Sequence, residues 1–346
     1  MNRAELMGKV QTVCGTISPD KLGQTLMHEH LLSDLRTPEQ RKVNEPEEPI
    51  SLTNVWDINY GRKKHRMQYV LDMKDIAQVE MSALRMLGGD SVVELTCGGI
   101  RPDPKGLADI QLGTGVNIIM GCGYYVEEYQ DPSNKKRRVD DFAREIVGQV
   151  FDGAWGTNVR AGIIGEIGSQ NPWTDLEKTV MRGAVIAQQE TGAALNIHPG
   201  RREDLPLEIA TTVKEWGADL SRTIISHIDR TILDVEPLLR LAETGVVLEF
   251  DMFGVENTYY PLKESVDLPN DGMRLRLIKA LVDRGHLDQV VISHDIDCRT
   301  RLTNFGGHGY GHIFRNVVPL MQARGFSREQ IDGILTENPK RLLTFV

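Results

Sequence analysis

Short apolar segments alternate with helix-like segments along most of this 346-residue chain, and this alternation limits the folds open to it. Eight segments have the character of buried strands: the residues leading into His30, then 91–96, 116–125, 161–166, 193–198, 223–227, 246–251 and 290–294. Apolar residues at helical spacing lie between them, at 69–87, 104–113, 138–152, 174–191, 204–216, 234–243 and 271–284. The end of the chain, 312–344, is expected to be helical with interruptions.

Strands that are apolar on both faces and alternate with helices indicate a parallel sheet covered by helices. Eight such units predict an α/β fold in which residues 1–346 form a single domain, a (β/α)8 TIM barrel. A doubly wound open sheet is the structural alternative. Residues 33–68, which are polar and contain several prolines, are expected to form a solvated loop or lid, and 300–312 a mobile loop over the same rim.

Histidine and carboxylate residues stand at the ends of the predicted strands. His28 and His30 close the first, Glu166 the fourth, His198 the fifth and His227 the sixth, and His294-Asp295 follows the eighth. In a parallel barrel all these ends meet at one rim, which hosts the active site. Five of the nine histidines fall here, so the sequence predicts a functional cluster.

Imidazole nitrogens and carboxylate oxygens suit Zn²⁺ or a similar divalent ion. Six ligands exceed the needs of one closed site and predict two ions that share a bridging carboxylate. We expect one ion on His28, His30 and Asp295, a second on His198 and His227, and Glu166 between them. His294 should face away, because neighbours on a strand point to opposite faces. The remaining histidines are expected in loops or on the surface: His65, His286, His308 and His312.

Composition excludes several classes of partner. The net charge of −9 provides no broad basic surface for nucleic acid. No apolar run is long enough to span a membrane, and the beginning of the chain lacks the apolar core of a signal peptide. Four scattered cysteines without a Cys-x-x-Cys pair predict free thiols and a cytoplasmic location. No phosphate-binding GxxxxGK[ST] loop and no G-x-S-x-G nucleophile elbow is present.

Several motifs together resemble the phosphotriesterase branch of the amidohydrolase superfamily, and within it the phosphotriesterase-related protein subgroup. The motifs run in order from about residue 8 to the end of the chain: His28-Glu29-His30, Ile164-Gly165-Glu166-Ile167-Gly168, His198-Pro199-Gly200, Ser226-His227, Asp229-Arg230-Thr231, Ser293-His294-Asp295 and Gly306-Gly307-His308-Gly309-Tyr310. The resemblance implies a binuclear centre, usually zinc, in which a metal-bridging hydroxide is the nucleophile. It also implies that Asp295 binds one metal, orients the hydroxide and accepts its proton.

The chain departs from the organophosphate-hydrolysing members of that family. Glu166 occupies the place of their carbamylated lysine, so the site should assemble without CO₂. Arg230 and Met252 align with the aspartate and histidine of their proton relay. Arg230 is therefore a candidate to bind an anionic group of the substrate. Tyr125 matches an aromatic residue that lies over the metals in related lactonases, and Arg201 is a further anion-binding candidate, with Arg299 and Arg301 weaker ones.

The resemblance to the related-protein subgroup implies hydrolysis of the amide bond of N-acetyltaurine and similar small anionic N-acyl amino acids. Analogy with its members also predicts a homodimer. In that reaction Asp295 would pass a proton to the leaving amine. Two alternatives stay open. A lactonase or phosphotriesterase-like ester hydrolase could use the same metals, and a non-catalytic barrel could bind metal or partner proteins.

Overall fold

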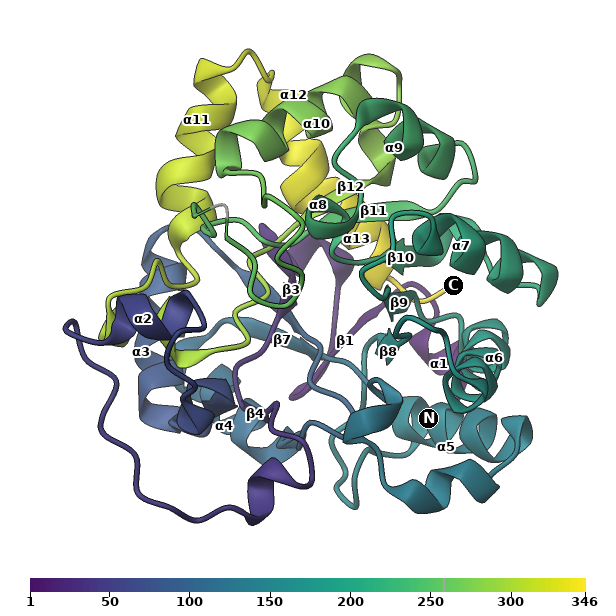
Figure 1. The fold of residues 1–346 in the computed structure, drawn as a ribbon. Helices are drawn as coiled ribbons and strands as arrows, with labels where there is room; N and C mark the ends of the chain where they lie inside the picture. Colours follow the sequence, from purple (N-terminus) through teal and green to yellow (C-terminus); the bar gives the residue numbers. More distant parts are fainter. Residues whose placement is uncertain (258) are drawn as a thin grey trace.

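The computed structural model is described for residues 1–257 and 259–346, and its centre is a closed ring of eight parallel strands (Figure 1). Five of the strands form one sheet in the order β12-β11-β10-β9-β8, and three form another in the order β3-β6-β7. Their bounds are β3 Thr25–Glu29, β6 Ser91–Glu94, β7 Asn117–Met120, β8 Ile164–Gly168, β9 Leu195–His198, β10 Thr223–Ile225, β11 Val247–Phe250 and β12 Val290–Ile292. The predicted barrel is confirmed.

Backbone hydrogen bonds close the ring where the two sheets meet. At one seam the amides of Gly162 and Gly165 donate to the carbonyls of Met120 and Cys122, which joins β7 to β8. At the other, the amide of Asp295 donates to the carbonyl of His28, beside β12 and β3. Gly165 has φ +126°, and a Cβ there would lie 2.4 Å from the carbonyl oxygen of Asn196, so this close approach requires glycine.

The barrel interior is filled by one apolar side chain from the start of each strand. These side chains pack against one another in a single cluster: Met27, Val93, Ile119, Ile163, Ala194, Ile224, Val247 and Val291. Val10 and Leu22 from the beginning of the chain and Leu342 and Leu343 from its end join them. The end of the barrel at which the strands begin is therefore filled with side chains, and any pocket must open at the rim formed by their carboxyl ends.

Helices surround the strands and bury a second apolar layer against them (Figure 1). They are α3 Lys74–Met86, α4 Pro104–Thr114, α5 Val139–Phe151, α6 Asp175–Thr191, α7 Leu205–Glu215, α9 Val235–Ala242 and α10 Asp271–Asp283. A capping box begins α6, since Thr174 accepts from the amide of Glu177 and Glu177 accepts from that of Thr174. The interrupted helix at the end consists of 313–317, α11 Val318–Ala323, α12 Arg328–Asp332, 333–337 and α13 Asn338–Leu343.

The structure differs from the sequence-based expectations in several short elements. The segment 8–25 forms a hairpin of β1 Val10–Thr12 and β2 Gly15–Ile17. The loop 33–68 contains the helix α2 Val55–Asn59, and β4 Ser33–Asp34 pairs with β5 Val70–Leu71, so the helix expected from residue 69 begins only at Lys74. Neither of two four-residue helices, α1 Arg3–Leu6 and α8 Ile228–Thr231, was predicted. Such short elements depend on tertiary contacts more than on periodicity.

The structure agrees with the predictions that the cysteines are free thiols and that no apolar segment is long enough to span a membrane. Cys14 is exposed, Cys97, Cys122 and Cys298 are buried, and all four are free thiols. Within 1–257 and 259–346, no helix combines the length and the apolar character needed to cross a bilayer.

Candidate metal centre

The six predicted metal ligands lie together at the carboxyl rim of the barrel; five are buried, and the Asp295 side chain is 16% exposed. Glu166 stands at the centre of the group. Its Oε1 lies 3.3 Å from His30 Nε2, and its Oε2 lies 2.8 Å from His198 Nδ1, 3.4 Å from His227 Nε2 and 3.7 Å from His28 Nε2. The two oxygens thus face different histidines, as a bridging carboxylate must.

Asp295 completes the half of the cluster that contains His28 and His30. Its Oδ1 lies 3.6 Å from His28 Nε2 and 3.3 Å from His30 Nε2, and its Oδ2 lies 3.6 Å from His227 Nδ1. His198 and His227 form the other half, with His198 Nδ1 and His227 Nε2 only 2.9 Å apart. Glu166 Oε2 also lies near His28, and Asp295 Oδ2 near His227, so the six side chains form one continuous cluster and their division between two ions stays a prediction.

Hydrogen bonds on the far side of three rings leave one nitrogen of each ring facing the cluster. His28 Nδ1 donates to Glu249 Oε2 at 3.0 Å, and His227 Nδ1 donates to Asp251 Oδ1 at 2.9 Å. His30 Nδ1 lies 2.9 Å from the hydroxyl of Thr96. Each of these bonds directs Nε2 toward the cluster and fixes the tautomer in which Nε2 carries a lone pair.

His28 Nε2 provides the test of whether these residues suit a metal. The atom is buried and, within the described residues, has no hydrogen-bond partner. A buried polar nitrogen without a partner is costly, and coordination to a cation removes that cost. The donor set of four imidazoles and two carboxylates is the kind that divalent metals prefer, so the residues fit the ions implied by the sequence.

Backbone irregularities turn several of these side chains into the barrel. Leu26 packs in the outer layer and Met27 in the interior, so strict alternation would direct His28 outward. Instead, three residue steps from Leu26 to Glu29 oppose two steps of β6, which is a β-bulge with one extra residue. A bulge of the same kind lies between Ile164 and Ile167 of β8, just where Glu166 enters the cluster.

Two other candidate ligands have left-handed backbone conformations. His227 has φ +55° and Asp295 has φ +49°, values that are uncommon for residues other than glycine. His227 is held by its amide, which donates to Asp251 Oδ2 at 2.9 Å. Asp295 is held by Arg301, whose Nη1 donates to the Asp295 carbonyl at 2.7 Å. Backbone strain of this kind collects at functional sites, where surrounding contacts maintain it.

The surroundings shift the pKa values of these groups in opposite directions. Burial, with help from His227 and Arg230, lowers the pKa of His198 to about 3, which keeps this ring neutral. Burial raises the pKa of Asp295 above its ordinary value, although His227 and His30 oppose that shift. Glu166 has a pKa well below its ordinary value, because the favourable contacts with His198 and His28 outweigh its burial.

The three predicted substrate-binding residues line a pocket of about 50 Å³ that opens onto the cluster. The Tyr125 ring packs edge-on against the His198 ring, with 4.8 Å between centroids. Arg230 is buried, and its Nη2 donates to the carbonyl of Pro199 at 3.0 Å. Arg201 Nε donates to the hydroxyl of Tyr260 at 2.6 Å. Within the described residues, neither guanidinium is paired with a carboxylate, so both are available to an anion in the pocket.

Of the weaker arginine candidates, one lies in the pocket and one does not. Arg301 lines the pocket and faces Asp297 at 3.7 Å. Arg299 instead pairs with Asp72 at 2.7 Å and donates to the carbonyl of Val70, so it holds the β5 segment and is unavailable to the substrate.

The histidines outside the cluster behave partly as expected. His294 faces away from the cluster, and its Nδ1 lies 2.7 Å from Glu29 Oε1. Glu29 also accepts from the amide of Ile296, so it joins β3 to the segment after β12 within the barrel wall. His65 lies in the loop 33–68 as expected, but it is buried there, and its Nε2 bonds to the carbonyl of Glu48.

Sequence reasoning missed the carboxylates that orient the histidines. Glu249 and Asp251 both lie at the end of β11, the seventh barrel strand, and are buried. Glu249 also accepts from Asn196 and Ser226, which fixes its position. A usable signal was present, since Glu249 and Asp251 alternate at a strand end in the same way as His28 and His30.

Comparison with known proteins agrees with this geometry. The family model described as the phosphotriesterase family matches residues 8–343. The chain belongs to the phosphotriesterase family. An N-acetyltaurine hydrolase of Xenopus tropicalis is 41% identical over 347 residues, covering 99% of each chain.

Two solved structures place this phosphotriesterase-family member among proteins of the same architecture. A resiniferatoxin-binding protein from Rhodobacter sphaeroides is 34% identical, with a TM-score of 0.91 over 97% of this chain and 95% of that one. A phosphotriesterase homology protein from Escherichia coli, which holds phosphate in its active site, is 29% identical, with a TM-score of 0.78 over 94% and 99%.

Proposed function

We propose that this protein is a metal-dependent amidase that hydrolyses small anionic N-acyl amino acids, with N-acetyltaurine as the first substrate to test. The observation that carries the proposal is a pair of guanidiniums, buried at Arg230 and partly buried at Arg201, that line the pocket over the histidine cluster and have no carboxylate partner within the described residues. A buried cation without a counter-ion is costly, and an anionic substrate supplies the missing charge. The similarity to the N-acetyltaurine hydrolase of Xenopus tropicalis supports the choice of substrate.

The metal assignment is part of this proposal. His28 and His30, each through Nε2, and Asp295 would hold one divalent ion, and His198 through Nδ1 and His227 through Nε2 the other. Glu166 would bridge the two, since its oxygens face different histidines. Zinc suits this set of nitrogen and oxygen ligands. When bound, such ions polarise a carbonyl group and lower the pKa of water.

The remaining steps belong to side chains of the chain itself. Asp295 would take the proton released when water attacks the amide carbon and then give it to the nitrogen of the leaving amine. Arg230 and Arg201 would hold the sulfonate or carboxylate of the substrate, which fixes the amide between the cluster and Tyr125.

We further propose that residues 1–346 act as one domain, because both ends of the chain pack into the cluster that closes the bottom of the barrel. The cytoplasmic location and the homodimer stay predictions.

A substrate panel tests the proposed function. The protein, with its metal content measured, is assayed with N-acetyltaurine, N-acetyl amino acids, lactones and phosphotriesters. We expect about two equivalents of divalent metal and the highest kcat/KM on the anionic amides. Higher kcat/KM on neutral lactones or phosphotriesters would instead support the ester-hydrolase alternative. Full turnover by protein from which the metal has been removed would contradict the metal-dependent mechanism.

A further inference from the structure

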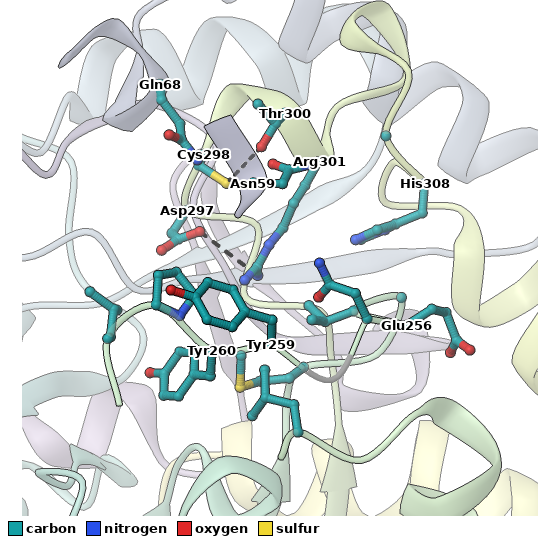
Figure 2. A pocket seen from close by; sticks show the side chains of 18 of the residues that line it. Asn59, Gln68, Glu256, Tyr259, Tyr260, Asp297, Cys298, Thr300, Arg301 and His308 are labelled. Carbon is teal, nitrogen blue, oxygen red and sulfur yellow. Dashed lines mark hydrogen bonds and ion pairs between the residues drawn. The ribbon is translucent and has the colours of Figure 1, made fainter. Parts of the chain in front are cut away.

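A second, larger hollow adjoins the metal pocket and plays no part in the reaction as described so far. It has a volume of about 310 Å³, against about 50 Å³ for the pocket over the metal ligands. The two hollows share a boundary formed by Met252, Tyr260, Leu262, Asp297 and Arg301. We call the larger hollow the outer chamber; it lies between α2, the segment after β11 and the segment after β12 (Figure 2).

The walls of the outer chamber combine aromatic and aliphatic side chains with polar ones such as Gln68 and Thr300. Trp56, Tyr69, Val255, Tyr259, Pro261 and Leu268 line it beyond the shared boundary. Tyr259 stacks on Tyr60 with 4.9 Å between ring centroids and 2° between their planes, which joins the segment after β11 to the end of α2. These aromatic and aliphatic residues favour the binding of an apolar group, because its burial removes apolar surface from water.

The charges in the chamber are largely compensated, unlike those in the metal pocket. Arg301 faces Asp297 at 3.7 Å and donates to the backbone carbonyls of His294 and Asp295 (Figure 2). Glu256 accepts from the amide of Asp271 at 2.9 Å. The lining therefore provides no guanidinium free of a carboxylate, so the anionic end of a substrate has its place beside Arg201 and Arg230 instead.

Two polar atoms of the chamber lining have no hydrogen-bond partner within the described residues: Asp297 Oδ1, which faces Arg301 at 3.7 Å, and His308 Nε2. His308 reaches into it from the segment after β12 (Figure 2), and within the described residues its buried Nε2 has no hydrogen-bond partner. His308 Nδ1 lies 3.1 Å from the carbonyl of Gly309, so the ring proton sits on Nδ1 and Nε2 is an acceptor. The ring also packs on Gly254, where a Cβ would lie 2.6 Å away, and is held in place.

These observations define which part of a substrate can enter the chamber. With the anion at the two guanidiniums and the amide at the metal ligands, the end of an N-acyltaurine left to extend into the chamber is its acyl group. We propose that the outer chamber binds this acyl group, and that the protein accepts N-acyl amino sulfonates and amino acids whose acyl chain is uncharged, mainly apolar and longer than acetyl. This inference rests on the proposed amidase function.

The length of the acyl chain provides the first test. The value of kcat/KM is measured for N-acetyl-, N-butanoyl-, N-hexanoyl- and N-succinyltaurine. Burial of each added methylene is expected to raise kcat/KM by on the order of threefold until the chamber is filled, while the charged succinyl chain should give no gain. A steady fall of kcat/KM from acetyl to hexanoyl would overturn the inference and leave the amidase proposal intact, whereas no turnover of any acyltaurine would contradict the amidase proposal itself.

A variant that fills the chamber provides the second test. Val255→Trp adds an indole to a wall that the metal pocket does not share. It is expected to lower kcat/KM for the hexanoyl substrate at least tenfold more than for the acetyl substrate. Val79→Trp, at an exposed position of α3, is the matched control and should lower neither. Equal losses on both substrates in Val255→Trp would contradict the inference.

A third measurement does not depend on the folding of a variant. Hexanoate and acetate are compared as inhibitors of N-acetyltaurine turnover by the unmodified protein. Hexanoate is expected to inhibit at least tenfold more strongly, because its chain reaches the apolar walls. Equal inhibition by the two acids would contradict binding of the acyl group in the chamber.

Discussion

His28 Nδ1 and Glu249 Oε2 lie 3.0 Å apart, with both residues fully buried inside the barrel. This contact places the His28 proton on Nδ1 and leaves Nε2 facing Glu166 and Asp295. Within the described residues, Nε2 has no hydrogen-bond partner. The carboxylate thereby determines how the histidine can bind a metal, although it is too far along the chain to be read as part of the same motif.

Glu249→Gln should weaken metal binding while the fold is kept. The amide has nearly the same shape, but it accepts the imidazole proton less well and lowers the basicity of His28. We expect a loss of 10- to 100-fold in metal affinity, as is typical when the partner of a ligating histidine is changed. Metal retention during titration with a chelator measures this. Glu243→Gln, exposed just after α9, is the control and should behave as the unmodified protein; unchanged affinity in Glu249→Gln would mean that the contact does not position His28.

Glu166→Ala should lose both metal and turnover. Glu166 faces His30 through one oxygen and His198 through the other, so its removal takes away the carboxylate that the two predicted sites share. We expect metal content to fall well below two equivalents per chain and activity to fall by at least 10³-fold, the scale typical of a lost catalytic group. Elemental analysis and initial rates measure the two effects. Full metal content together with full activity would rule out Glu166 as the bridge.

The unmodified protein should also be indifferent to bicarbonate. A glutamate carries its own carboxylate, so reconstitution of metal-free protein with divalent metal is expected to give the same activity with and without added bicarbonate. Activation by bicarbonate would indicate that a carbamylated side chain, rather than Glu166, joins the metals.

Arg230→Gln and Arg201→Gln should act mainly on the anionic end of the substrate. Loss of a charge-assisted hydrogen bond costs about 1.5–3 kcal/mol, which corresponds to a 10- to 150-fold fall in kcat/KM for N-acetyltaurine. A neutral amide of similar size, such as N-ethylacetamide, lacks the sulfonate and should lose less than threefold. Equal losses on both substrates would show that the arginines support the structure of the pocket and do not bind the anion.

Asp271 should stabilise the protein at neutral pH and cease to do so in acid. Burial raises its pKa, but His312, Gly254 and Arg274 outweigh that effect and lower it to about 2. A carboxyl whose pKa is lower in the folded than in the unfolded protein contributes stability above the unfolded value, near 3.8, and loses it as the pH falls toward 2. The contribution corresponds to about 2 kcal/mol.

Denaturant unfolding of the unmodified protein and of Asp271→Asn, both free of metal, measures this contribution. The unmodified protein should be more stable by about 2 kcal/mol at pH 6, and the difference should shrink as the pH falls from about 4 toward 2. A difference that stays constant over this range would contradict the assignment, because it would show that packing and not charge is lost.

The sequence could predict the residues of the site more completely than their orientation. His28, Glu166, His198, His227 and Asp295 were found because strand ends of a parallel barrel must meet at one rim. The boundaries of the strands were less accurate: the segment 116–125 was expected to be a strand, whereas β7 spans only Asn117–Met120. Apolar character continues beyond the last ladder hydrogen bond, so hydropathy alone overestimates strand length.

The left-handed residues and the bulges could not be predicted. His227 and Asp295 have positive φ although neither is glycine, and no local signal marks them. Their conformations are maintained by Asp251 and Arg301, which contact their backbones from elsewhere in the fold. The outer chamber was likewise invisible, since its walls come from three loops that only the closed barrel brings together.

By itself, the sequence determined the barrel and the chemical identity of its metal ligands, because both follow from local properties: the alternation of apolar strands with helices, and the residue types at strand ends. The tertiary structure decided which way those residues point. An extra residue in β3 and another in β8 reverse the alternation that the sequence predicts, and buried carboxylates on β11 choose the nitrogen that His28 and His227 present. The register of a strand and the hydrogen bonds of a buried ring depend on neighbours far away in the chain, and only folding supplies them.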